Sequence, residues 1–191
     1  NNTKVLLDAL CDGDAFYEGG ASGGNGEYAF FDMKKLEHLN GHYLREADDA
    51  RLAALVAARI GEGADEALLT QAMPVLKVRA KNLNEVVEGA AFLFAKRPLA
   101  MTEKAAQLLE GDARAILRQI YERLRAENDW TSETLEATTK ALAEELGLGL
   151  GKLAQPMRAA LTGTTTSPGI FDVLVLLGRD EALARLDAQA A

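Results

Sequence analysis

Apolar residues recur every three or four positions through most of this chain, and that spacing limits the possible folds more than any other feature. In residues 31–46, for example, Met33, Leu36, Leu39 and Tyr43 fall on one face of a helix. Composition agrees, because alanine, leucine and glutamate dominate while only 6% of the residues are aromatic. We expect an all-α protein.

Capping residues and helix breakers predict where individual helices begin and end. Gly111 is expected to divide residues 102–128 into two helices, and Pro74 to leave the turn around Lys77 to Arg79 irregular. Ser167 would cap a helix with Pro168 in its first turn. Further start and stop residues are expected at Asp32, at Asp48 or Asp49, at Gly61, at Thr131 or Ser132, and at Gly178.

The chain is expected to have three parts. Residues 1–30 are rich in glycine, lack the strand–glycine–helix order of a phosphate-binding loop and are interpreted as a linker. A break at "RPLAM", within 97–101, then separates two packed helical subdomains, 31–100 and 101–191.

Charge and cysteine content limit the binding partners and the cellular compartment that we expect for this protein. The net charge is −8 and the pI is about 4.9, which argues against a general coating of nucleic acid but leaves room for a local basic patch. A single cysteine, Cys11, excludes an internal disulfide and favours a reducing compartment. The sequence contains no apolar run of membrane-spanning length and no signal peptide. We expect a cytoplasmic protein without membrane contact.

The sequence offers little for catalysis or metal binding. His38 and His42 lie one helical turn apart, as a pair of metal ligands would, but no glutamate of an HExxH motif stands between them. We interpret them as surface residues. No serine lies in a GxSxG turn, so we predict no catalytic residue and no metal site.

Basic residues at three places favour a binding function. Lys77, Arg79 and Lys81 alternate at the end of one predicted helix, and Arg158 precedes a threonine-rich loop. The helix start at Ser167 would offer free backbone N–H groups and the positive end of a helix dipole. Further basic residues and histidines recur along the first predicted helix, away from its apolar face: Lys34, Lys35, His38, His42 and Arg45. These donors suit unstacked RNA bases, but a helical protein-interaction domain remains equally open on this reasoning.

Three motifs carry a family resemblance. "FDMKKLEHLNGHYLRE", "AQPMRAALTG" and "SPGIFDVLVLLGRDEALARL" together resemble the C-terminal half of bacterial glutamyl-tRNA synthetase, in order and in spacing. The match runs from about Phe31 to the end of the chain.

The resemblance implies an all-α anticodon-binding region of two subdomains, joined in the parent enzyme to a Rossmann-type catalytic domain. Neither the HIGH-type nor the KMSKS-type signature of class I synthetases occurs here, so this chain should not aminoacylate alone. The implied partners are the anticodon arm of glutamate tRNA and the parent catalytic domain. ATP and Mg²⁺ belong to the parent enzyme, no cofactor to this chain, and a monomer is expected.

The resemblance also implies specific tRNA contacts. Arg79 matches an arginine that contacts the third anticodon base, and Arg158 matches the arginine of a "QPLR" motif. Arg185, by contrast, is expected to be an ordinary surface residue. The predicted tRNA-binding residues are Lys35, His38, Lys77, Arg79, Arg158, Ser167, Pro168 and Ile170.

Overall fold

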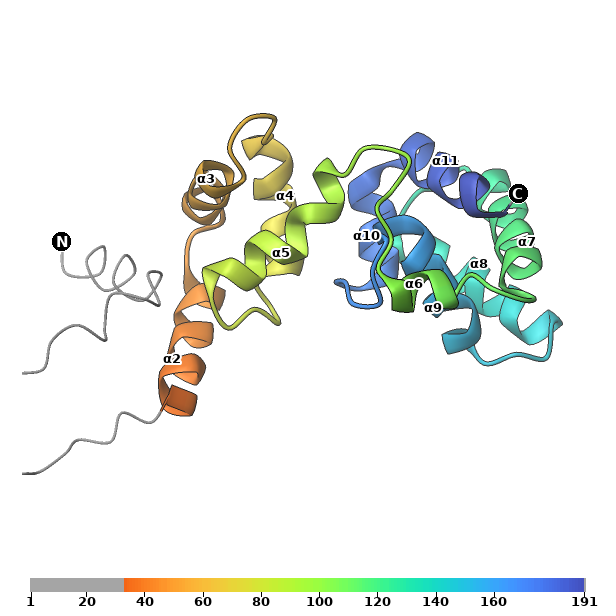
Figure 1. The fold of residues 1–191 in the computed structure, drawn as a ribbon, viewed down its shortest axis with the longest axis horizontal. Coiled ribbons are helices and arrows are strands. Elements are labelled where there is room, and N and C mark those ends of the chain that lie inside the picture. The colour runs from red at the N-terminus through yellow and green to blue at the C-terminus, as the bar shows by residue number, and fades with distance from the viewer. Residues whose placement is uncertain (1–32, 191) are drawn as a thin grey trace, which may run out of the picture. The chain divides into compact units, whose positions relative to one another are not determined.

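A computed structural model describes residues 33–190 of the chain, with side chains from Glu37 onward, and the described part is built of helices without strands (Figure 1). The all-α expectation is confirmed. The glycine-rich stretch 1–30, Cys11 and the predicted cap Asp32 lie outside the described residues.

The chain forms two compact units that divide between Glu88 and Gly89, inside one helix. The first contains α2 (Met33–Glu46), α3 (Asp49–Ile60), α4 (Glu66–Leu76) and the start of α5 (Leu83–Phe94). The second contains the rest of α5, then α6 (Glu103–Gln107), α7 (Ala113–Ala126), α8 (Ser132–Glu145), α9 (Leu150–Thr162), α10 (Ile170–Leu177) and α11 (Arg179–Ala190). The expected parts 1–30, 31–100 and 101–191 stay a prediction.

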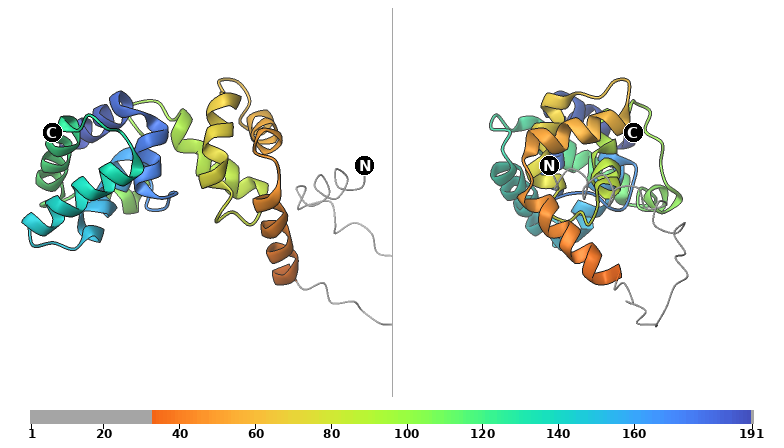
Figure 2. Two further views of the ribbon diagram at one scale, coloured as in Figure 1. Left: turned by 180° about the vertical axis from the view of Figure 1, so that it is seen from behind. Right: turned by 90° about the vertical axis from the view of Figure 1, so that its left-hand side faces the viewer.

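Helices α3 and α4 form the centre of the first unit by packing against each other. Their buried side chains include Leu52, Val56, Leu69 and Met73. Helix α2 projects from this pair, as the views in Figures 1 and 2 agree.

The apolar face predicted for α2 is not buried within the described residues. Leu39 and Tyr43 are 46% and 50% exposed, whereas Leu44 is 1% exposed. The helix contacts the rest of its unit through Asn40, Gly41 and Leu44. The apolar spacing therefore identified the helix correctly but not the face that packs.

Helix α9 lies at the centre of the second unit, where α6, α7, α8, α10 and α11 all contact it (Figure 2). Its residues Leu153, Met157 and Leu161 are fully buried. The loop between α9 and α10 therefore begins at the end of a helix that is packed in the core of the second unit.

Most of the predicted helix boundaries are confirmed. Asp48 caps α3 by accepting a hydrogen bond from the Arg51 backbone N–H at 2.9 Å, and Thr131 caps α8. Gly111, with φ +62°, separates α6 from α7. Helix α4 continues two residues past Pro74 because a proline near the end of a helix removes only one hydrogen bond. The turn that follows is irregular, as predicted.

Two expectations about individual residues are wrong. Helix α10 begins at Ile170, after Gly169, and Ser167 does not cap it, because its hydroxyl donates to the Pro168 carbonyl at 2.8 Å. Arg185 is no surface residue: it is 2% exposed and lies in the core of the second unit. No helix within residues 33–190 has the length and hydropathy needed to span a bilayer.

Candidate nucleic-acid interface

Arg79 lies in the turn between α4 and α5, which also contains Val78, Ala80 and Lys81. Val78 and Arg79 are exposed and Ala80 is buried, so the turn presents its middle outward. Among the described residues no hydrogen bond or ion pair occupies the Arg79 guanidinium. Its five N–H donors are therefore available to a ligand.

Lys77 sits at the start of the same turn, but its charge is already engaged. The Lys77 ammonium donates to the Ala47 carbonyl at 2.8 Å and lies 2.6 Å from Asp49 Oδ1. That carboxylate oxygen is buried and accepts no well-aligned hydrogen bond in the described part of the chain, so the contact is an ion pair. With a side chain 15% exposed, Lys77 would have to leave these partners to touch RNA.

Helix α2 packs against the far side of the turn. Asn40 Nδ2 donates to the Lys81 carbonyl at 2.8 Å, and the Lys81 ammonium lies 3.4 Å from Glu37. His38 is exposed two residues before Asn40. Lys35 belongs to α2, and its side chain lies outside the described set.

In the second unit, Arg158 lies half-buried one helical turn before the end of α9. Its backbone carbonyl accepts from the Thr162 hydroxyl at 2.8 Å. Thr162 Oγ1 also accepts from the Thr164 backbone N–H at 3.3 Å, and the Thr164 hydroxyl donates to the Thr166 carbonyl at 2.6 Å. These threonines hold the backbone of the loop that follows Arg158.

Gly163 fixes the same loop against the segment before α6. It has φ +72°, and a side chain there would come inside contact distance of the Ala100 carbonyl oxygen. The Gly163 carbonyl accepts from the Thr102 backbone N–H at 2.9 Å. Only a glycine fits both the backbone angle and this close approach.

The start of α10 differs from the open donor site that the sequence suggested. Asp172, in its first turn, folds back over Gly169, and its other carboxylate oxygen accepts from Ser132 at 3.3 Å. A carboxylate therefore partly compensates the positive end of this helix. Ser167 and Pro168 are half-buried, and the whole of Ile170 is 5% exposed, so Ile170 offers little surface to a ligand.

The structure thus groups the predicted residues at two places. Lys77 and Arg79 share the α4–α5 turn, against which α2 packs. Arg158, Ser167, Pro168 and Ile170 lie around the α9–α10 loop. The contact of Asn40 with the turn was not predicted, although Asn40 belongs to the quoted "LNG" motif, because a single sequence does not reveal which backbone group its side chain contacts.

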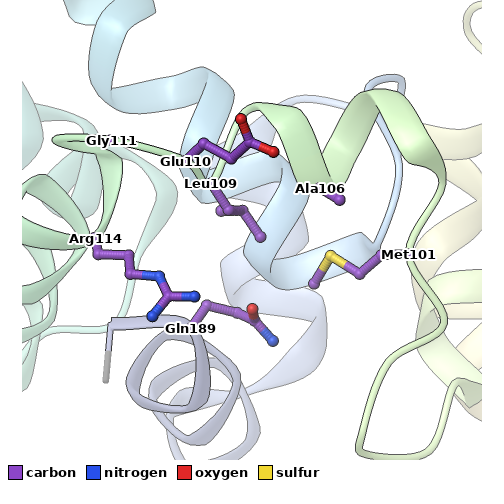
Figure 3. A pocket seen from close by; sticks show the side chains of 7 residues that line it. All are labelled: Met101, Ala106, Leu109, Glu110, Gly111, Arg114 and Gln189. Carbon is purple, nitrogen blue, oxygen red and sulfur yellow. The ribbon is translucent and has the colours of Figure 1, made fainter.

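A cavity of about 470 Å³ in the second unit contains none of these residues. Met101 and Leu109 provide apolar walls, and Figure 3 shows Arg114 and Gln189 extending into the same space from α7 and α11. The Glu110 carboxylate points away from it (Figure 3). No group of three or more potential metal ligands occurs in residues 37–190.

A family model described as an anticodon-binding domain matches residues 44–190, which include both groups of predicted contacts apart from those on the first part of α2. The chain therefore belongs to the anticodon-binding domain family.

Curated relatives of this chain include glutamate–tRNA ligases. Glutamate–tRNA ligase 1 of Erythrobacter litoralis is 78% identical over 160 residues, covering 84% of this chain and 33% of the relative. Glutamate–tRNA ligase 2 of Novosphingobium aromaticivorans is 66% identical over 168 residues, covering 84% and 34%. The chain thus spans about a third of the length of these relatives.

A solved structure of a glutamate tRNA ligase from Elizabethkingia meningosepticum, in complex with its amino acid, shares the fold. The TM-score is 0.71 at 22% identity, over 84% of this chain and 32% of that one.

Proposed function

We propose that this chain is the tRNA-reading part of a glutamate–tRNA ligase, an enzyme that attaches glutamate to its tRNA with ATP. The observation that carries the proposal is the anticodon-binding match over residues 44–190, because it includes both the α4–α5 turn and the α9–α10 loop. The anticodon arm of glutamate tRNA is the proposed ligand. The related glutamate–tRNA ligases support that choice.

Arg79 is proposed to read the third anticodon base. An anticodon base splayed out of its stack exposes its pairing edge. A guanidinium donates to two acceptors at once, so it suits O2 and N3 of cytosine. Guanine presents N–H donors at the same edge and would face the guanidinium donor to donor. Arg79 would in this way separate glutamate tRNA from glutamine tRNA.

The α9–α10 loop is proposed to contact the other anticodon bases. Arg158 would supply charge, and Ser167, Pro168 and Ile170 would supply hydroxyl and backbone groups. Lys35 and His38 on α2 are proposed to lie near the anticodon stem, and Lys77 to support the turn.

The remaining proposals concern the parent enzyme. Aminoacylation would use ATP and Mg²⁺ in a catalytic domain of the parent rather than in this chain. The parent is proposed to be a cytoplasmic monomer.

The first prediction concerns Arg79→Ala. We expect affinity for glutamate tRNA to fall by about fivefold to a hundredfold, because a bidentate base contact contributes about 1–3 kcal/mol. The preference for cytosine over guanine as the third anticodon base should fall with it. The measurement is a titration of fluorescently labelled tRNA at two salt concentrations, since phosphate contacts make affinity fall as salt rises.

Arg51→Ala is the matched control, because Arg51 is an exposed arginine of the same unit on α3. Its variant should bind both tRNAs as the unchanged chain does. Equal binding of tRNAs with native and scrambled anticodons would contradict base reading. Salt-insensitive capture of a protein without tRNA binding would instead favour a helical protein-interaction domain.

A further inference from the structure

The turn that carries Arg79 is held at both ends by contacts with groups outside it. At its start, the Lys77 ammonium is fixed between the Ala47 carbonyl and the Asp49 carboxylate. These two groups lie at the junction of α2 and α3. The first residue of the turn is thereby tied to a different part of the unit.

At the other end, both backbone polar groups of Lys81 are occupied. Its N–H donates to Glu85 Oε2 at 2.8 Å, and its carbonyl accepts from Asn40 Nδ2 at 2.8 Å. Glu85 comes from the first turn of α5, and Asn40 comes from α2, 41 residues earlier in the chain. The orientation of the Lys81 peptide groups is therefore set from two sides.

Helix α2 approaches the turn closely at Gly41. A Cβ atom at Gly41 would lie 3.4 Å from the Ala80 carbonyl oxygen and 3.7 Å from Lys81 Cα. The backbone of α2 is thus in direct contact with the two residues that follow Arg79. Asn40 is half-buried at this contact.

We propose that Asn40 is a positioning residue that holds the Arg79 guanidinium in place for the anticodon. Asn40 fixes the Lys81 carbonyl at the end of the turn, and the backbone that leads back from Lys81 determines where the exposed side chain of Arg79 begins. A flexible arginine on an unrestrained turn loses more conformational entropy when it binds. This inference rests on the proposed function of Arg79, but it concerns a residue that does not itself touch the base.

The test is Asn40→Ala in the full 191-residue chain. Alanine favours helix, so α2 should persist while the bond to Lys81 is lost. We expect about a threefold to tenfold loss of affinity for glutamate tRNA, in line with the loss of one hydrogen bond. The preference for cytosine over guanine as third anticodon base should fall by a similar factor. Combined with Arg79→Ala, the substitution should cause no further loss.

Asn84→Ala is the matched control. Asn84 is an exposed asparagine of the same unit whose side chain accepts from Arg59 and makes no hydrogen bond to the turn within the described residues. Its variant should retain both the affinity and the base preference. An unchanged base preference in Asn40→Ala, or a full additional loss in the Arg79→Ala background, would overturn the positioning role.

Hydrogen exchange separates this inference from the function on which it rests. Asn40→Ala should speed amide exchange at Lys81, whose N–H donates to Glu85, whereas Asn84→Ala should not. Unchanged exchange in Asn40→Ala would overturn the inference whatever the tRNA titration shows. Faster exchange together with an Arg79→Ala variant that binds tRNA normally would support the restraint on the turn and reject the proposed base reading.

Discussion

Arg185 in α11 supplies hydrogen-bond donors to main-chain carbonyls at the ends of two other helices. Its guanidinium donates to Phe92 and Ala95 at the end of α5, at 2.9 and 2.8 Å, and to Leu161 at the end of α9, at 2.7 Å. It also pairs with Glu181. Helix C-termini leave carbonyls without donors and favour a positive charge, so this buried cation is well compensated.

At the residue scale, sequence reasoning failed where function or burial depends on distant backbone atoms. The partners of Arg185 lie 24, 90 and 93 positions away along the chain, and nothing in "LARLDA" indicates them. The prediction of an irregular turn at Arg79 did not need such information. Irregular chain after Pro74 already suggested a turn there.

The residue-scale prediction is that Arg185→Ala lowers the free energy of unfolding of the second unit by about 3–5 kcal/mol, because it leaves three main-chain carbonyls without their donor and Glu181 with Arg97 as its remaining ion-pair partner among the described residues. Urea unfolding followed by fluorescence of Trp130, the single tryptophan, measures it. Arg123→Ala, which removes an exposed pair with Glu145, should cost no more than about 1 kcal/mol. A comparable small loss for Arg185→Ala would contradict the capping role.

At the scale of the element, cap residues predicted helix starts well when they act locally. Asp48 and Thr131 each bond a backbone N–H three residues ahead, which a sequence pattern can encode. Ser167 is also of a residue type that commonly caps helices. Its hydroxyl is drawn instead to the Pro168 carbonyl, and Asp172 occupies the helix start. The sequence alone does not show which of the nearby polar groups Ser167 contacts, or that Asp172 lies at the start of α10 in its place.

The element-scale prediction compares two glycines at positive φ in the second unit. Gly147, at φ +65°, has open space around it, so Gly147→Ala should cost about 1 kcal/mol for the backbone angle alone. Gly163→Ala should cost about 1–3 kcal/mol more, because its side chain would overlap the Ala100 carbonyl. Trp130 fluorescence during urea unfolding measures both variants. Equal losses would show that the loop moves away from Ala100 without cost.

At the scale of the whole molecule, the sequence predicted the fold class and the presence of two helical parts. It did not predict that the division between compact units falls inside α5, between Glu88 and Gly89. A break at "RPLAM" was the visible signal, because proline interrupts helices. The two ends of α5 belong to different compact units, and the amino-acid composition of the helix does not indicate this.

The whole-molecule prediction compares two spectroscopic signals, one that reports the second unit alone and one that reports both units. Trp130 belongs to the second unit, whereas far-ultraviolet ellipticity reports helices of both units. In Arg185→Ala, the fluorescence midpoint should fall to lower urea while part of the ellipticity keeps its original midpoint. Two separated transitions would violate two-state behaviour. Curves that shift together over their full amplitude would instead show that α5 couples the units into one cooperative fold.

The Lys77 ammonium also has a consequence for chemical labelling. Acylating reagents attack the uncharged amine of an accessible lysine, and Lys77 is enclosed by the Ala47 carbonyl and the Asp49 carboxylate. Lys81 and Lys140, whose side chains are 60% and 54% exposed, should react first. Peptide mapping after brief acetylation would then report Lys77 as protected even without RNA, and protection at that site would be no footprint of a bound tRNA.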